Sequence, residues 1–320
     1  MTPIATILVA TDFSPDGNNA VWRAALLARQ LDAQLRLMHV VHPAGFKPLR
    51  HWLLRPIDID LQAAQARATL RQLSAEISRR HDVTAAVEVR VGDPHEELLR
   101  ASAQADLLVL GQRGRKPWKS LVIGGTAERM LHASRTPLLV VKHQADGPYR
   151  RVLVPVDLTP HSDAAVQVGA SLAPSAGIEV FHAIESAREA VLREAGVTQT
   201  VLREARARDE ARVNARMRRS VARVGLDGRR VNFSLTYGHP VPSTLRVLRA
   251  AGADLVVVSP GRASAGIRFL VGSVSHRLLR LTDRDTLIVP RVRRAPQPSP
   301  RSPFAPAARP PVAQHPMGTA

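Results

Sequence analysis

The chain of 320 residues is long enough for about two domains that each bury a core, and 45% of its residues are apolar. It contains no cysteine, which excludes disulfides, thiol catalysis and cysteine-based metal sites. Its formal net charge of +18 is carried almost wholly by arginine and favours nonspecific attraction to polyanions. No apolar run approaches the roughly 18 residues that span a bilayer, and the N-terminal residues lack the basic segment of a signal peptide, so we expect a cytoplasmic protein.

Short apolar runs alternate with amphipathic segments along the first half of the chain. The run 7–10 predicts a buried strand ending at Asp12, and Ser14 or Asp16 is expected to cap the helix that follows. A loop is expected over 45–56. Further strands are predicted over 35–41, 83–91, 107–110 and 137–141, with helices over about 58–81 and 96–103. This alternation predicts a doubly wound α/β domain with parallel strands.

The stretch 106–130, DLLVLGQRGRKPWKSLVIGGTAERM, joins a buried strand to a helix through glycines. Gly111 and Gly114 follow the strand, and Gly124, Gly125 and Thr126 open the helix. Backbone N–H groups at a helix N-terminus attract anions, so we expect a site for phosphates, such as those of a nucleotide. Glycines also mark ordinary tight turns, which is the alternative interpretation.

The spacing of these glycines resembles a family signature. Gly111-x2-Gly114-x9-Gly124 is similar to the Gly-x2-Gly-x9-Gly-Ser/Thr pattern of the ATP-binding branch of the universal stress protein family. One position departs from the pattern, because Gly125 stands where the family has Ser or Thr and the hydroxyl is displaced to Thr126.

The second half of the sequence repeats the first. Five segments match in the same order: 151–160 with 6–15, 180–183 with 37–40, 237–240 with 91–94, 253–258 with 105–110, and 272–273 with 124–125. Such a repeat indicates a duplicated domain and resembles the tandem form of the family over about residues 1–291. We therefore predict domains at 1–144 and 149–291, followed by a disordered Pro/Arg-rich tail at 292–320.

The resemblance implies a five-stranded parallel sheet of order 3-2-1-4-5 in each domain. The last strands, 137–141 and 285–289, would each leave an exposed edge with unpaired backbone groups. We predict that these two edges meet across a pseudo-twofold axis within one chain, as an intramolecular pseudo-dimer. A homodimer of such tandem chains stays an alternative.

The resemblance also implies which residues bind an adenine nucleotide. Asp12 matches the aspartate that accepts hydrogen bonds from the adenine or ribose region, although it can also cap the next helix, and the backbone of Val40 matches a position facing the adenine. The expected cofactor is ATP, with Mg as an optional companion. The full predicted set is Ala10, Thr11, Asp12, Phe13, Val40, Leu110, Gly111, Gln112, Arg113, Gly114, Gly124, Gly125 and Thr126.

The matching site in the second half is expected to be weaker. Ser259 replaces the first glycine, Gly261 is one residue out of step, and Pro260 removes a donor and stiffens the loop. Its predicted residues are Pro155, Val156, Asp157, Gly261, Gly272 and Ser273.

The resemblance implies a stress-response module that senses a nucleotide, with at most slow ATP hydrolysis. The sequence contains no phosphate-loop lysine motif, no His-Glu-x-x-His and no Gly-x-Ser-x-Gly elbow. His39 and His42 lack a third metal ligand beside them, so we interpret them as structural. One alternative is a nucleotide-free interaction protein with degenerate sites, and its protein partner would be unknown.

The other alternative is a polyanion binder driven by arginine charge. The segment 188–230 contains the most basic helix, with an apolar stripe at Val213, Met217, Val221 and Val224, which we interpret as an outer helix with a solvated basic face. Because no aromatic platform or helix-turn-helix pattern accompanies it, nucleic acid is not expected as the primary partner.

Overall fold

The structure is a computed structural model that describes residues 3–42, 59–112, 124–185, 194–226, 230–259 and 273–290. The predicted tail, the loop at 45–56 and residues 113–123 of the glycine-rich segment 106–130 lie outside these residues. The first half consists of β1 (Thr6–Ala10), α1 (Pro15–Leu31), β2 (Gln34–Val41), α2 (Ile59–His81), β3 (Ala85–Val91), α3 (Pro94–Ser102), β4 (Leu107–Gly111), α4 (Gly125–Ala133) and β5 (Leu138–Val141). The second half consists of β6 (Arg151–Pro155), α5 (Pro160–Leu172), β7 (Gly177–Ile184), α7 (Gln199–Arg223), β8 (Val231–Tyr237), α8 (Pro240–Ala250), β9 (Leu255–Val258), α9 (Ser273–Leu281) and β10 (Asp285–Ile288).

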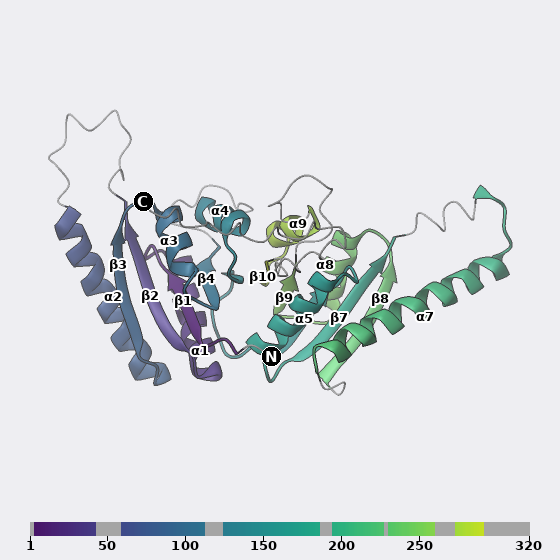
Figure 1. The fold of residues 1–320 in the computed structure, drawn as a ribbon, viewed down its shortest axis with the longest axis horizontal. Coiled ribbons are helices and arrows are strands. Elements are labelled where there is room, and N and C mark those ends of the chain that lie inside the picture. The colour runs from purple at the N-terminus through teal and green to yellow at the C-terminus, as the bar shows by residue number, and fades with distance from the viewer. Residues whose placement is uncertain are drawn as a thin grey trace, which may run out of the picture.

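All the strands belong to one sheet of order β3-β2-β1-β4-β5-β10-β9-β6-β7-β8 (Figure 1). Within each half the strands are parallel and follow the predicted order 3-2-1-4-5. The predicted fold class is therefore confirmed.

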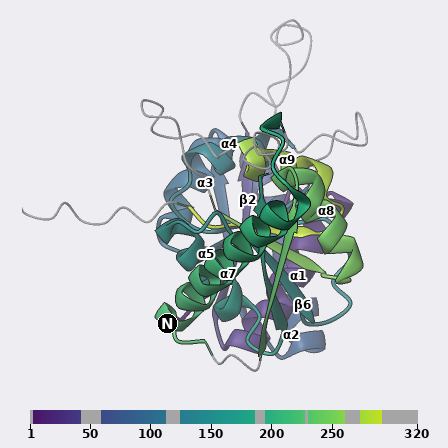
Figure 2. The same cartoon turned by 90° about the vertical axis from the view of Figure 1, so that its right-hand side faces the viewer.

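Helices cover both faces of the sheet, as the end-on view in Figure 2 shows. Ile7 and Val9 of β1 pack in one hydrophobic cluster, which contains residues of α1, α2, α5 and α7. Leu8, between them, packs in the opposite cluster, which contains residues of α3, α4, α8 and α9. Because both faces of the central strands are buried, β1, β4, β5 and β9 are continuous apolar runs, whereas the outer strands β3 and β8 alternate apolar with polar residues.

The two halves join through β5 and β10, which pair antiparallel. The residue pairs are Val140 with Thr286, Leu139 with Leu287, and Leu138 with Ile288. The two edges that were predicted to meet do meet, so the chain forms an intramolecular pseudo-dimer. Each edge satisfies the backbone groups of the other, which removes two exposed strand edges.

A buried polar cluster reinforces this junction around Asp285, which is 1% exposed. Its carboxylate accepts hydrogen bonds from the Tyr149 hydroxyl (2.6 Å) and from the backbone N–H of Lys142 (2.8 Å). Arg23 lies 3.4 Å from the same carboxylate and stacks over the Tyr149 ring at 4.3 Å. Burial, reinforced by Asp285, raises the pKa of Tyr149 well above its ordinary value, so the hydroxyl stays a donor. The cluster therefore fastens α1 of the first half to β10 of the second.

Lys142 adds a further link between the halves. Its ammonium donates to the backbone carbonyls of Leu279 (2.5 Å) and Thr282 (2.8 Å) at the end of α9. A cation at a helix C-terminus satisfies carbonyls that have no partner within the helix. The first half thus caps a helix of the second.

None of the helices in the described part of the chain combines the length and the apolar character that crossing a bilayer requires.

Candidate functional site

The strand ends of the first half meet where the predicted site was placed. Ala10, the last residue of β1, pairs with Met38 of β2 on one side and with Leu110 of β4 on the other. The turn that carries Asp12 and the strand end at Gly111 therefore belong to neighbouring strands. The strand order reverses between β1 and β4, and such switch points are where ligands bind in doubly wound sheets.

The turn between β1 and α1 is held by its own side chains. The Asp12 carboxylate accepts hydrogen bonds from the backbone N–H (3.1 Å) and the hydroxyl (2.5 Å) of Ser14. The Ser14 hydroxyl in turn accepts from the Gly17 N–H (3.1 Å) and caps α1. Of the two predicted caps, Ser14 is therefore the one used. Asp12 supports the cap indirectly and keeps its carboxylate at the strand end.

His39 fixes the next residue of this turn. Phe13 has a φ of 63°, in the left-handed region that few non-glycine residues adopt. Its ring stacks on His39 at 4.4 Å, and Nδ1 of His39 lies 2.8 Å from the backbone oxygen of Thr11. The same contact recurs in the second half, where Nδ1 of His182 lies 2.7 Å from the oxygen of Val156. These contacts agree with the structural role predicted for His39.

Gly111 is required by packing against the start of α1. A Cβ at this position would lie 2.4 Å from the backbone oxygen of Asp16 and 2.9 Å from the backbone nitrogen of Gly17. Gly17 is equally restricted, because its Cβ would lie 2.8 Å from the Thr11 hydroxyl oxygen and 2.9 Å from an Asp12 carboxylate oxygen. These glycines bring the β4 end and the α1 N-terminus together, whether or not a ligand binds.

The helix after the glycine-rich segment begins close to the end of β4. The Gly124 N–H donates to the backbone oxygen of Gln112 (2.8 Å), which ties the two ends of the segment 113–123 together. Gly124 caps α4 without any side-chain hydrogen bond, and Gly125 and Thr126 are exposed. A Cβ at Gly125 would meet nothing within 4 Å. The first turn of α4 therefore has backbone N–H groups without a side-chain cap, and a side chain at Gly125 would lie in open space.

The structure brings together most of the predicted residues of the first half. Thr11, Phe13, Val40 and Gln112 lie at the ends of β1, β2 and β4, beside Ala10, Asp12, Leu110 and Gly111. Arg113 and Gly114 lie outside the described residues, as do Gly261 and Gly272 of the second half. Ser273 is the first residue of α9.

The second half differs from the first in the side chains that surround its aspartate. Asp157 accepts hydrogen bonds from the hydroxyls of Thr159 (2.6 Å) and Ser162 (2.6 Å). Ser162 occupies the place of Gly17, which has no hydroxyl to offer Asp12. Although burial raises the pKa of Asp157, the hydrogen bonds from Ser162 and Thr159 hold it below its ordinary value. Sequence reasoning missed Ser162, which a comparison of the two repeats at this position would have found.

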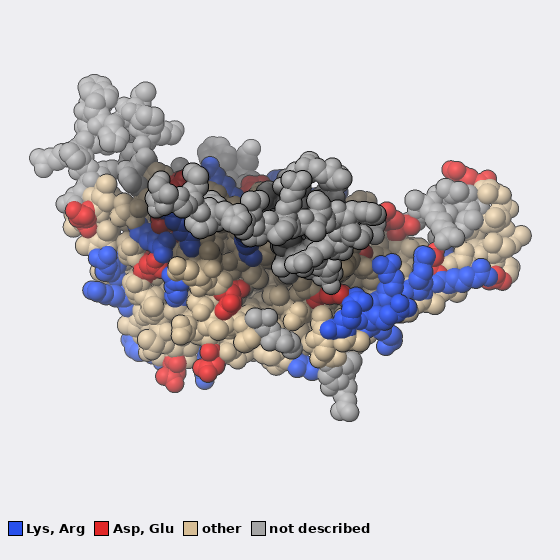
Figure 3. Space-filling model, viewed as in Figure 1, with Lys and Arg blue, Asp and Glu red and all other residues tan. Residues whose placement is uncertain are grey.

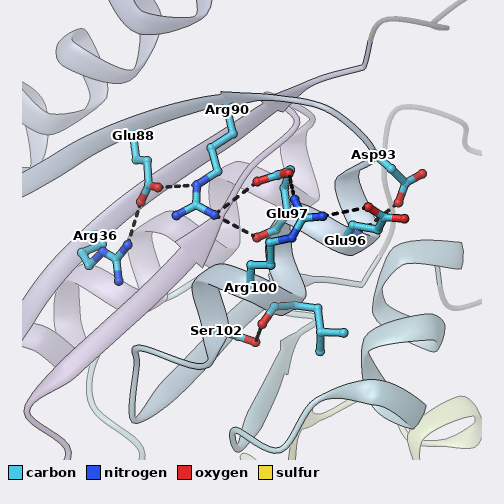
Figure 4. Close-up of polar contacts among 9 residues, drawn as sticks. Arg36, Glu88, Arg90, Asp93, Glu96, Glu97, Arg100 and Ser102 are labelled. Atoms are coloured by element: carbon cyan, nitrogen blue, oxygen red, sulfur yellow. Dashed lines mark hydrogen bonds and ion pairs between the residues drawn. The ribbon is translucent and has the colours of Figure 1, made fainter.

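A charged cluster on β2, β3 and α3 is neutralised within itself. Figure 4 shows Glu88 between Arg36 and Arg90, and Glu97 between Arg90 and Arg100. Burial raises the pKa of Glu88, but the hydrogen bonds from Arg36 and Arg90 bring it below its ordinary value.

In the described ranges no group of three side chains is arranged to hold a metal ion. A shallow pocket over α8, lined by Pro242, Leu245, Arg246, Arg249 and Ala250, contains none of the predicted site residues.

Comparison with known families gives two matches along this chain, over residues 3–142 and 148–290, and both are to the universal stress protein family. The chain belongs to this family. The two matches correspond to the two halves of the sheet, so this is a tandem universal stress protein.

Individual relatives support the family and the fold. A universal stress protein of Mycolicibacterium smegmatis is 27% identical over 184 residues, which cover 54% of this chain and 61% of the relative. This chain therefore matches about three fifths of the length of that relative. A universal stress protein of Methanocaldococcus jannaschii is 25% identical over 138 residues, 42% of this chain and 81% of the relative. The crystal structure of a universal stress protein from Archaeoglobus fulgidus aligns with a TM-score of 0.67 and 19% identity, covering 90% of this chain and 98% of that one, which shows the shared fold.

Proposed function

We propose that this tandem universal stress protein binds ATP or a related adenine nucleotide at the strand ends of its first half, as a ligand-sensing module of a stress response. One observation carries the proposal. The Asp12 turn and the α4 N-terminus flank adjacent strands at the point where the strand order reverses. A carboxylate and a set of backbone N–H donors therefore lie at the same end of the sheet, where the parallel strands of the first half have their C-terminal ends.

These groups suit the two ends of a nucleotide. The N–H groups of the first turn of α4 and the helix dipole favour the phosphates, and the exposed Gly125 leaves room for their approach. The Asp12 carboxylate is an acceptor suited to hydroxyl or amine donors of the ribose or adenine. The backbone at Val40, near the end of the adjacent strand β2, would lie along the adenine.

The first half is the better candidate of the two. Ser259 stands where the first half has Gly111, and Pro260 removes a backbone donor from the second half. We therefore expect about one nucleotide per chain.

Isothermal titration of ATP into the intact chain tests this proposal. The Asp12→Ala variant is expected to lose most of the binding, because its carboxylate contacts the nucleotide and also orients the β1–α1 turn. The matched Asp157→Ala variant, changed at the equivalent position, is expected to bind like the unmodified chain. Two equal sites, or loss through Asp157 alone, would show that the second half binds.

The nucleotide-free alternative also has an observation in its favour, because packing alone accounts for Gly111 and Gly17. Nucleotide released by acid from the purified chain and identified by mass separates the two functions. A second check is Gly114→Val, in which a branched Cβ would block close backbone approach and should weaken ATP binding in a folded variant. Unchanged binding would remove the phosphate-binding role of this loop.

A further inference from the structure

Helix α7 presents a row of arginines that the nucleotide site does not use. Its 25 residues contain eight arginines, three acidic residues and no lysine. Five of the arginines recur at spacings of four, four, three and four residues, which places them on one face over about 22 Å of helix. We call them the arginine stripe: Arg208, Arg212, Arg216, Arg219 and Arg223, all exposed.

The helix is held firmly, so the stripe has a fixed position. Val213, Met217 and Val221 are buried in the core cluster that α7 shares with the sheet. Two members of the stripe anchor it at the side: Arg216 donates to the backbone oxygen of Leu158 (2.9 Å), and Arg223 pairs with Asp163 (2.8 Å). With its apolar side occupied, α7 has no face to insert into a membrane.

The nearby carboxylates do not neutralise all the arginines, so this surface keeps an excess of positive charge. Arg208 pairs with Glu204 (3.1 Å) and Arg212 with Asp209 (2.7 Å), both within the exposed helix. Among the described residues no carboxylate pairs with Arg219. Figure 3 shows the result as blue side chains gathered along α7, and the balanced cluster on β2, β3 and α3 contrasts with it.

We propose that the arginine stripe is a sequence-independent binding site for the phosphate backbone of nucleic acid. A linear row of cations fits a linear polyanion better than a compact one. Arginine forks bind phosphate oxygens in pairs, and each strand of a duplex carries a charge about every 3.4 Å, so the stripe faces about six phosphates of one strand. This function is separate from the proposed nucleotide site.

The duplication supplies a matched control surface. Helix α2 occupies the same place in the first half and carries four arginines and two acidic residues. Arg67, Arg71 and Arg79 are exposed on it. Replacing these three by glutamine lowers the formal net charge from +18 to +15, as does replacing Arg208, Arg212 and Arg219. The second set leaves Arg216 and Arg223 in place to anchor α7, and glutamine keeps a good helix propensity.

The test measures binding of a fluorescently labelled 30-base-pair DNA duplex of random sequence by anisotropy, from 50 to 200 mM salt. We use the intact chain, R208Q/R212Q/R219Q and R67Q/R71Q/R79Q, so the Arg-rich C-terminal segment is common to all three. Circular dichroism checks that the helices are retained. We expect the α7 variant to bind DNA at least tenfold more weakly at 50 mM salt. We also expect the slope of the logarithm of the binding constant against the logarithm of the salt concentration to be shallower by about two to three, because each lost phosphate contact removes about 0.9 from it. The α2 variant should change affinity less than threefold.

Three results would overturn the proposal. Equal weakening in both variants would mean that overall charge, and not the stripe, attracts DNA. An α7 variant that binds like the unmodified chain would place the DNA contact elsewhere. The third result concerns competition for the labelled duplex, with a polyglutamate peptide and unlabelled duplex compared at equal charge concentration. If the peptide displaces the labelled duplex as effectively as the unlabelled duplex does, the stripe is a site for acidic proteins.

Discussion

Leu139 of β5 pairs directly with Leu287 of β10 at the junction of the two halves, and the two residues occupy equivalent places in the repeat. Val109 of β4 pairs with Leu139 just as Val257 of β9 pairs with Leu287. The pseudo-twofold axis therefore passes between these two leucines. Both are fully buried, so the core is continuous from one half to the other.

The buried cluster at this junction should make a large contribution to stability. In Asp285→Ala, Arg23 and Tyr149 lose a carboxylate partner in a buried setting, and the Lys142 N–H loses its acceptor. Removing one partner of a buried charge pair costs about 3–5 kcal/mol, and we expect a loss of this size in the free energy of unfolding. Urea denaturation followed by circular dichroism measures it.

The neighbouring carboxylate of Asp283 is the control for this change. Its side chain is 66% exposed and pairs with Arg284 at the surface. Asp283→Ala should change the free energy of unfolding by less than about 1 kcal/mol. Equal effects of the two substitutions would argue against a special role for the buried cluster.

Lys142 should make stability depend on alkaline pH. Burial lowers its pKa from 10.5 to about 8, although Asp285 and Asp283 act to raise it. Between these values the unfolded chain keeps a proton that the folded chain has released, so folding becomes more favourable as the pH rises. Compared with Lys142→Met, the unmodified chain should gain up to about 3 kcal/mol of unfolding free energy between pH 7.5 and 10.5. A difference that stays constant or falls over this range would contradict a lowered pKa.

Two glycines of the candidate site should respond differently to alanine. Gly111→Ala places a Cβ against the backbone of Asp16 and Gly17, and such overpacking costs about 1–3 kcal/mol. Gly125→Ala places its Cβ in open space and should leave the melting temperature equal or slightly higher. Thermal melts of both variants check this. A tolerated Gly111→Ala would mean that the start of α1 can shift.

Restoring the family hydroxyl should strengthen nucleotide binding. Gly125→Ser adds a hydroxyl at the exposed first turn of α4, where it can donate to a phosphate without displacing any described atom. We expect affinity for ATP to rise about two- to tenfold by isothermal titration, which corresponds to the net contribution of one ordinary hydrogen bond. Gly125→Ala, which lacks the hydroxyl, should not show this gain. Equal affinities for the two variants would show that the hydroxyl does not reach the phosphates.

The strand order was implied by the family resemblance. The repeat and the apolar runs predicted two α/β halves that each end in an edge strand, and therefore the pairing of the two halves. Helix starts were less certain: α3 begins at Pro94 instead of Glu96, since Asp93 accepts from the N–H groups of His95 and Glu96 and caps the helix. The junction cluster was not predicted, because Arg23 and Asp285 are far apart in the chain and meet only when the halves associate. At the site, the spacing marked Gly111 as a phosphate residue, whereas its contact with α1 depends on a three-dimensional approach that spacing does not encode.

The cluster at the junction has no second copy within the molecule. By the repeat, Asp285 corresponds to Pro137, Lys142 to Pro290 and Arg23 to Val168, none of which can form the same contacts. In an assembly of two identical subunits every interface residue occurs twice, so a change that benefits one side is imposed on the other. Fusion into one chain removes that constraint. The first half could therefore acquire Arg23 and Lys142, and the second half Asp285, without a matching change in the other copy.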